Sequence, residues 1–171
     1  MDAMKAILTR RSVRQYADGK IPEATVKSLL EAAMSAPSAG NQQPWQFIVI
    51  DDRDILNGIM RVHPYSSMLK SAPLAVVVCG DLGREKHKGY WVQDCSAATQ
   101  NLLVAARGLE LGAVWLGVYP LEDRVTGLRA LLDLPESIVP LAVISIGLPA
   151  VEQGPVDRYD AQRIHRNKWQ L

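Results

Sequence analysis

The chain has 171 residues and a net charge of +1; 48% of its residues are hydrophobic and 22% are charged. These proportions are typical of one globular domain that buries a sizeable core, and they give no general attraction for nucleic acid. No apolar run is long enough to cross a membrane, and the two cysteines form no CxxC pair. We therefore expect a single cytoplasmic domain over residues 1–171, without a nucleic-acid or membrane partner.

The N-terminal helix is expected to begin after Asp2, whose side chain suits an N-cap, and to end in the basic segment RRSVR. On such a helix Arg10 and Arg14 would share one face, where two guanidinium groups could bind one anion. The alternative is a solvated basic helix end, because most runs of charge are simply exposed.

Residues 36–50, APSAGNQQPWQFIVI, join a helix to a buried strand. Pro37 ends the helix, Gly40 and Asn41 tolerate positive φ, and residues 47–50 have the apolar character of a core strand. A loop of small residues can bring backbone amides close to a flat ligand. The alternative is an ordinary surface loop, because helix–loop–strand junctions are common.

Apolar runs and helical stripes alternate through the rest of the chain. Further strands are expected at residues 74–79, 113–119 and 141–147, and helices at residues 22–36, 94–111 and 121–132. This alternation alone predicts a doubly wound parallel sheet.

The helix at residues 94–111 is apolar around most of its circumference, so we expect it to lie between the sheet and a second subunit. Gly112 is expected to cap its C-terminus. Gly117 lies inside a predicted strand, where a glycine often indicates the close approach of a ligand. The tail from Leu148 has too few apolar residues to build a core, so we expect it to wrap another surface.

Other chemistry has little support in the sequence. There is no G-x-G-x-x-G, no phosphate-binding G-x-x-x-x-G-K-[ST], no G-x-S-x-G and no Cys/His cluster with zinc spacing. His63 precedes a proline, and because a histidine without a partner motif is more often structural, no role is assigned to it. The charged segment Gly83–Trp91 could close over a site or could be a solvated connection.

Four segments together resemble the FMN-dependent nitroreductase family, and in particular its short, single-domain members. They are ILTRRSVRQY, APSAGNQQPWQF, GAVWLGVYP and DRYDAQRIHRNKW. The resemblance implies an α+β fold with a central mixed β-sheet flanked by helices, instead of a parallel sheet. It also implies an intertwined homodimer with FMN in the subunit interface, in which residues 148–171 form an extension that wraps the partner subunit.

The resemblance further implies roles for the basic residues. Arg10, Arg11 and Ser12 would hold the phosphate and ribityl chain of FMN, and Arg158 would complete the phosphate site. Arg14 would lie near the pyrimidine edge of the flavin, where a cation stabilises the anionic reduced ring. No protein side chain would act as a catalytic acid or base, because the flavin performs the chemistry itself.

The flavin ring would be contacted by two other segments. Pro37, Ser38 and Asn41 would reach it from the other subunit, and Leu116 and Gly117 would bring backbone amides to its N5 and O4 side. Members of the family often carry a further Asn or Lys between the first two strands. Lys70 is the residue here that could fill that place, although the sequence alone does not align it.

The implied activity is reduction of nitroaromatics, quinones or similar acceptors by NADH or NADPH in a ping-pong cycle. One alternative is a relative with specialised flavin chemistry, such as reductive dehalogenation or flavin fragmentation. That reading needs a dedicated lid, for which Gly83–Trp91 is short. The other alternative is a flavin-binding protein without catalytic activity.

Overall fold

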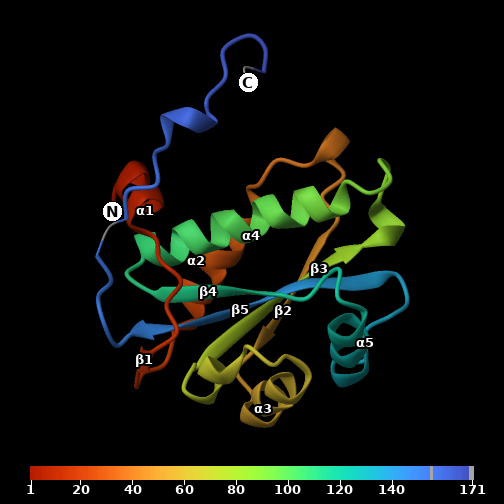
Figure 1. Cartoon of the computed structure of the whole chain (residues 1–171). Helices are drawn as coiled ribbons and strands as arrows, with labels where there is room; N and C mark the ends of the chain where they lie inside the picture. The colour runs from red at the N-terminus through yellow and green to blue at the C-terminus, as the bar shows by residue number, and fades with distance from the viewer. Residues whose placement is uncertain (155, 170–171) are drawn as a thin grey trace.

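A sheet of five strands forms the middle layer of the protein (Figure 1), in a computed structural model that describes residues 1–154 and 156–169. The strands are β1 (Tyr16–Ala17), β2 (Trp45–Ile50), β3 (Leu74–Asp81), β4 (Gly112–Gly117) and β5 (Ile138–Pro149). The helices are α1 (Ala3–Thr9), α2 (Glu23–Met34), α3 (Arg53–Val62), α4 (Trp91–Gly108) and α5 (Glu122–Leu131). Short 3₁₀ turns are η1 (Ala39–Asn41), η2 (Ser67–Lys70), η3 (Leu82–Arg84) and η4 (Ala161–Arg163).

The main strands lie in the order β4-β5-β3-β2, and β1 pairs with the end of β5. Every ladder between these strands is antiparallel, so the parallel sheet predicted from the alternation of elements is wrong. The sheet is therefore antiparallel instead of mixed, and the one parallel pairing among the described residues is an isolated bridge between Ser12 and Ala113, outside the named strands. The α+β fold implied by the resemblance is confirmed.

Helices cover both faces of the sheet, and this explains why the sequence pattern of the strands predicted a parallel sheet. Val76 and Val78 of β3 pack into a core with α2 and α4, while Val77 and Cys79 pack into a second core with α3 and α5. All four side chains are fully buried. A strand buried on both faces reads as a continuous apolar run, whether its neighbours are parallel or antiparallel.

The first helix ends before the basic segment that follows it. Asp2 caps α1 as predicted, because its carboxylate accepts hydrogen bonds from two backbone amides of the first turn. Arg10 already has extended φ and ψ, so the prediction that Arg10 and Arg14 share a helix face is wrong. The single hydroxyl hydrogen of Tyr16 is shared between the carbonyl oxygens of Val13 and Ser145, which lie 2.9 and 3.1 Å from the hydroxyl oxygen, and this contact ties the extended segment to the sheet.

The long helix α4 begins earlier and ends earlier than predicted. It ends at Gly108, and Glu110 adopts the left-handed conformation that closes the turn, with φ of 62°. Gly112 is therefore not the cap but the first residue of β4. A Cβ at Gly112 would lie 2.6 Å from a methyl group of Val13, so the close passage of the basic segment requires a glycine there.

The C-terminal strand is longer than its apolar run. β5 extends to Pro149, so Leu148 and Pro149 belong to the sheet and the tail leaves the ladder only after them. Figure 1 shows the tail passing α1 and leading away from the sheet. In the described part of the chain, no helix is long and apolar enough to span a bilayer.

Candidate functional site

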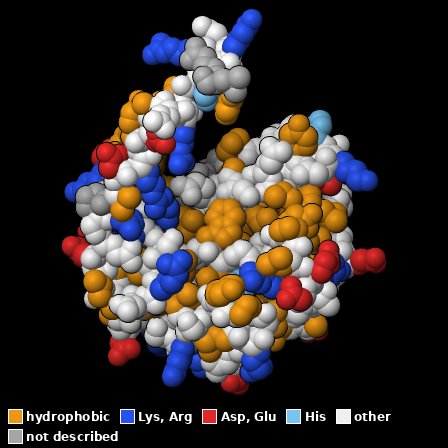
Figure 2. Space-filling view, viewed as in Figure 1, with side chains coloured by type: hydrophobic (Ala, Val, Ile, Leu, Met, Phe, Trp, Pro, Cys, Tyr) orange, Lys and Arg blue, Asp and Glu red, His pale blue; other side chains and the backbone are white. Residues whose placement is uncertain are grey.

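Three arginines gather where the tail passes the end of α1, on the side of the molecule where Figure 2 shows several Lys and Arg side chains close together. Burial lowers the pKa of Arg10, and the positive charges of Arg158 and Arg11 lower it further, which shows that the three guanidinium groups repel one another. All three line a cavity of about 220 Å³ between α1 and residues 156–159. The structure thus brings together the three arginines that the sequence analysis assigned to a phosphate.

Among the described residues none of these arginines forms an ion pair within 4.0 Å, although Asp157 lines the same cavity. Over residues 1–154 and 156–169, the ion pairs within 4.0 Å are Lys27–Glu31 and Arg163–Asp160. Arg11 donates instead to the backbone carbonyl of Gly154, at 2.7 Å. Clustered cations without a counter-ion are unfavourable in an empty protein, and a dianion such as a phosphate monoester would relieve the repulsion.

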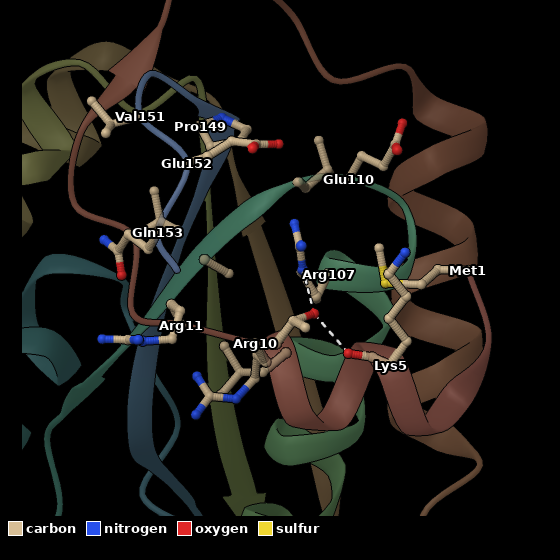
Figure 3. Close-up of a pocket in the computed structure, with 15 residues that line it drawn as sticks. Met1, Lys5, Arg10, Arg11, Arg107, Glu110, Pro149, Val151, Glu152 and Gln153 are labelled. Atoms are coloured by element: carbon tan, nitrogen blue, oxygen red, sulfur yellow. Dashed lines mark hydrogen bonds between the residues drawn. The ribbon is translucent and has the colours of Figure 1, made fainter. Parts of the chain in front are cut away.

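A second cavity of about 420 Å³ lies on the other side of the basic segment and is also lined by Arg10 and Arg11 (Figure 3). Arg107 of α4 reaches across it and donates from Nε to the hydroxyl of Thr9, at 3.0 Å. That hydroxyl donates to the carbonyl of Lys5, at 2.6 Å. This chain of bonds anchors the end of α1 to α4, and it fixes where the two arginines begin.

Arg14 lies apart from the phosphate cluster and beside Lys70. Both line a third cavity of about 610 Å³ between the basic segment and η2. Arg14 is exposed, and its guanidinium makes one long contact of 3.5 Å with the carbonyl of Ser12. The sequence could not align Lys70 with a flavin-edge residue, but the fold places it in the same cavity as Arg14.

The open edge of β4 runs beside the basic segment. The Val118 amide donates to Leu141 of β5, at 3.0 Å, and the Ala113 carbonyl accepts from Val13 on the other side, also at 3.0 Å. In an antiparallel ladder alternate residues face opposite neighbours. The N–H and C=O of Gly117 therefore point to the open edge, whereas those of Leu116 point to β5. Of the two predicted amide donors, Gly117 is the one that can meet a ligand.

The loop with Pro37, Ser38 and Asn41 lies at the opposite edge of the sheet. It leads into β2, which is separated from β4 by β5 and β3. Three strand spacings of about 4.8 Å amount to roughly 14 Å, and the open edge of β4 faces away from β2. One chain therefore does not bring these three residues to Gly117. The positive φ expected in this loop is observed at Gly40 and Asn41, at 52° and 53°.

Two buried polar pairs were missed by the sequence analysis. Asp94 of α4, which is 4% exposed, accepts from the Ala39 amide at 3.0 Å and from Nε2 of Gln42 at 2.7 Å. His63, which is 2% exposed, and Arg124 both bond to the carbonyl of Gly117. The sequence could have indicated a role for Asp94, because an acidic residue is unusual within an apolar helix. The His63–Arg124 pair did not, because 61 positions separate its members.

A model of the nitroreductase family matches residues 7–64 and 57–148 of the chain. The chain belongs to the nitroreductase family. It is 53% identical to a protein from Methanothermobacter thermautotrophicus whose name proposes an NADH dehydrogenase/NAD(P)H nitroreductase, over 99% of this chain and 88% of that protein. A solved structure from Parabacteroides distasonis, whose name proposes the same activities, has 42% identity and a TM-score of 0.94, covering 98% of both chains.

Another nitroreductase-family structure bears on the basic cluster. A protein from Desulfovibrio desulfuricans, described as a candidate nitroreductase, was solved in complex with FMN. It shares 30% identity with this chain and a TM-score of 0.85, over 98% of each chain.

Proposed function

We propose that the protein is an FMN-dependent NAD(P)H oxidoreductase. The observation that carries this proposal is the cluster of Arg10, Arg11 and Arg158, which has no carboxylate partner among the described residues. Such a cluster suits the phosphate of FMN, and Ser12 lies within the same extended segment. The FMN complex of the Desulfovibrio desulfuricans relative and the NAD(P)H in the name of the Methanothermobacter relative support the choice of cofactor and reductant.

The residues present fit the two ends of this cofactor. The arginine cluster would hold the phosphate, while Arg14 and Lys70 would place positive charge at the flavin's pyrimidine edge. Gly117 would offer its backbone N–H from the open edge of β4. The flavin supplies hydride and electron transfer, so the protein needs to bind, orient and tune it. Nitroaromatics and quinones are the proposed acceptors, and one site used in turn by reductant and acceptor gives ping-pong kinetics.

We also propose that the working form is a homodimer. Pro37, Ser38 and Asn41 lie at the opposite sheet edge from Gly117, so they could contact the same flavin only from a second copy of the chain. The tail presents large exposed side chains, including Tyr159 and Trp169, each 77% exposed. Large apolar groups left in solvent are typical of surfaces that bind a partner. The extension from the end of β5 is therefore proposed to wrap the partner subunit.

The decisive experiment compares FMN with riboflavin, which lacks the phosphate. The wild-type chain should bind FMN about tenfold or more tightly than riboflavin, because charge-assisted hydrogen bonds each contribute about 1.5–3 kcal/mol. Arg158→Gln should remove most of this preference. Arg61→Gln is the control, since Arg61 is exposed on α3, on the other face of the sheet. A wild-type chain that binds neither ligand would overturn the proposal.

Two further measurements separate the alternatives. NADH or NADPH consumption with a quinone acceptor should be catalytic, whereas a protein that only binds flavin would show no turnover. Sedimentation at micromolar concentration should give a dimer, and removal of residues 156–171 should weaken it without removing any strand. A monomer with wild-type activity would contradict the shared site.

A further inference from the structure

Two side chains converge on one backbone oxygen at the end of β4. Nε2 of His63 lies 2.9 Å from the carbonyl oxygen of Gly117, and Nη1 of Arg124 lies 2.8 Å from the same atom. His63 follows α3 and Arg124 lies in the first turns of α5, so both come from the layer below the sheet (Figure 1). Neither residue lines the cavities of the arginine cluster or of Arg14.

The surrounding bonds determine which ring nitrogen of His63 carries the proton. The Tyr65 amide donates to Nδ1 at 3.3 Å, so Nδ1 is the acceptor and Nε2 carries the hydrogen that it donates to Gly117. The 3.3 Å approach of Arg124 to Nε2 is then a contact between two donors that share one acceptor. Burial is the main cause that lowers the pKa of His63, and the charge of Arg124 acts in the same direction, while the bond to Gly117 opposes them. A lowered pKa favours the neutral ring.

Arg124 is itself held in place. Its guanidinium carbon lies 5.5 Å from the centre of the Tyr65 ring, an arrangement favourable for a cation. Gly117 has no side chain with which to fix its peptide, and a Cβ there would meet no described atom within 4 Å. The carbonyl belongs to the peptide that Gly117 shares with Val118, and the N–H belongs to the preceding peptide. The two side-chain bonds therefore fix the Gly117–Val118 peptide, to which the N–H is joined through the Gly117 Cα.

We propose that His63 and Arg124 are positioning residues that hold Gly117 towards the flavin, and that the charge of Arg124 tunes the flavin. This inference rests on the proposed function, because it requires a flavin at the open edge of β4. The neutral imidazole fixes the peptide, and the guanidinium adds positive charge one carbonyl group behind that edge. A fixed cation favours the reduced, electron-rich ring over the oxidised ring.

The test compares Arg124→Gln with Arg129→Gln in the full-length chain loaded with FMN. Arg129 is a matched control, because it lies on the same helix and also donates to a backbone carbonyl, that of Pro135 at 3.1 Å. We expect Arg124→Gln to move the flavin midpoint potential to a more negative value and to slow flavin reduction by NADH about tenfold. Loss of a donor that touches the reacting group directly costs about 100-fold or more, and this bond acts one step further away.

Conservative variants distinguish positioning from simple stability. Arg124→Lys keeps the charge and should recover the potential, while His63→Gln keeps an amide donor and should lose less reduction rate than His63→Leu. FMN affinity should change by less than about threefold in Arg124→Gln, because the phosphate site is untouched. If His63→Leu does not fold, the Arg124 series decides alone.

The outcomes separate this inference from the proposed function. If the wild-type chain binds no FMN, both fail. If the wild-type chain binds FMN and is reduced by NADH, but Arg124→Gln matches Arg129→Gln in potential and in rate, the positioning role is wrong and the proposed function stands. If the potential shifts and Arg124→Lys restores it, the positioning role holds.

Discussion

Polar groups near the two ends of α4 differ in whether they have partners within the chain. Near its N-terminus Asp94 is buried with Gln42, and every polar atom of the pair that faces the interior has a partner. Oε1 of Gln42 also accepts from the amides of Lys86 and His87, at 2.7 and 3.0 Å. Near its C-terminus Arg107 anchors the segment that contains Arg10, where three guanidinium groups lie close together without an ion pair within 4.0 Å among the described residues.

The difference separates polar groups that serve the fold from those that we propose serve a ligand. A buried carboxylate is unfavourable unless hydrogen bonds satisfy its oxygen atoms. The bonds of Asp94 and Gln42 meet this need, and they hold residues 38–42 and the 83–91 segment to the helix. The sequence alone did not decide whether residues 83–91 close over a site or form a solvated connection. In the structure the amides of Lys86 and His87 bond this segment to Gln42. In the arginine cluster Arg11 bonds to the Gly154 carbonyl, but among the described residues no ion pair within 4.0 Å balances the three charges. We therefore propose that the cluster binds an anionic ligand.

The largest effect should come from the ligand side of this comparison. Arg10→Gln should weaken FMN binding by roughly 10- to 100-fold, because one charge-assisted hydrogen bond is worth about 1.5–3 kcal/mol. The same change removes repulsion from Arg11 and Arg158, so the apo-protein should be as stable as wild type or more stable. FMN titration and urea unfolding of the apo-protein measure the two quantities. Equal losses of binding and of stability would show that the cluster also serves the fold.

The opposite pattern is expected at Asp94. Asp94→Asn replaces one acceptor by a donor that faces the Gln42 amide, and an unsatisfied buried polar group costs about 1–3 kcal/mol. Urea unfolding should therefore show a clear loss of stability in the apo-protein. Asp54→Asn is the control, because Asp54 is exposed in the first turn of α3. Wild-type stability in Asp94→Asn would mean that the network is dispensable.

Arg14 tests whether a positive charge contributes to FMN binding or to the flavin midpoint potential. Arg14→Gln should lower the flavin midpoint potential while changing FMN affinity less than Arg158→Gln does, because the phosphate is charged in both redox states. Two unit charges 4 Å apart interact by about 4 kcal/mol at an effective dielectric of 20, and the exposure of Arg14 reduces this to about 1 kcal/mol. Spectroelectrochemical titration, with Lys70→Gln as a parallel variant, measures the shift. Release of FMN without a shift in potential would place Arg14 at the phosphate instead.

The smallest effect concerns His63, whose bonds are complete like those of Asp94. Its pKa is lowered from the ordinary 6.5, chiefly by burial, although Gly117 and Asp123 act in the other direction. The unfolded chain therefore binds a proton at a higher pH than the folded chain does, so stability falls as the pH drops below about 6.5. Thermal unfolding between pH 7.5 and 5 should show a shallower loss in His63→Gln than in wild type. Identical pH profiles would indicate that His63 does not contribute.

The sequence predicted the segments of this fold better than their arrangement. The apolar runs of β3 and β4 and the cap at Asp2 were read correctly, because each depends on neighbouring residues alone. The direction of neighbouring strands could not be predicted in the same way. A strand covered by helices on both faces has a continuous apolar sequence in a parallel sheet and in an antiparallel sheet alike. β1 was missed because a strand of two residues has no measurable period.

In the site, too, the residues could be named from the sequence, whereas contacts between residues far apart in the chain could not be predicted. Arg10, Arg11 and Arg158 could be named from the resemblance, and the fold brought them together across 148 positions of sequence. The end of α1 was misplaced because the length of a helix depends on packing, here on the bond between Arg107 and Thr9. Gln42 read as one more polar loop residue, although it is only 4% exposed.

The strand order has a consequence for how the protein would behave on dilution. If Gly117 of one copy and Asn41 of the other contact the same flavin, each bound flavin also links two chains. Cofactor loading and subunit association are then one equilibrium, and FMN in excess raises the apparent strength of association by mass action. The measured FMN dissociation constant would fall as protein concentration rises. Repeated washing of a dilute preparation would remove flavin and yield monomers in the same step.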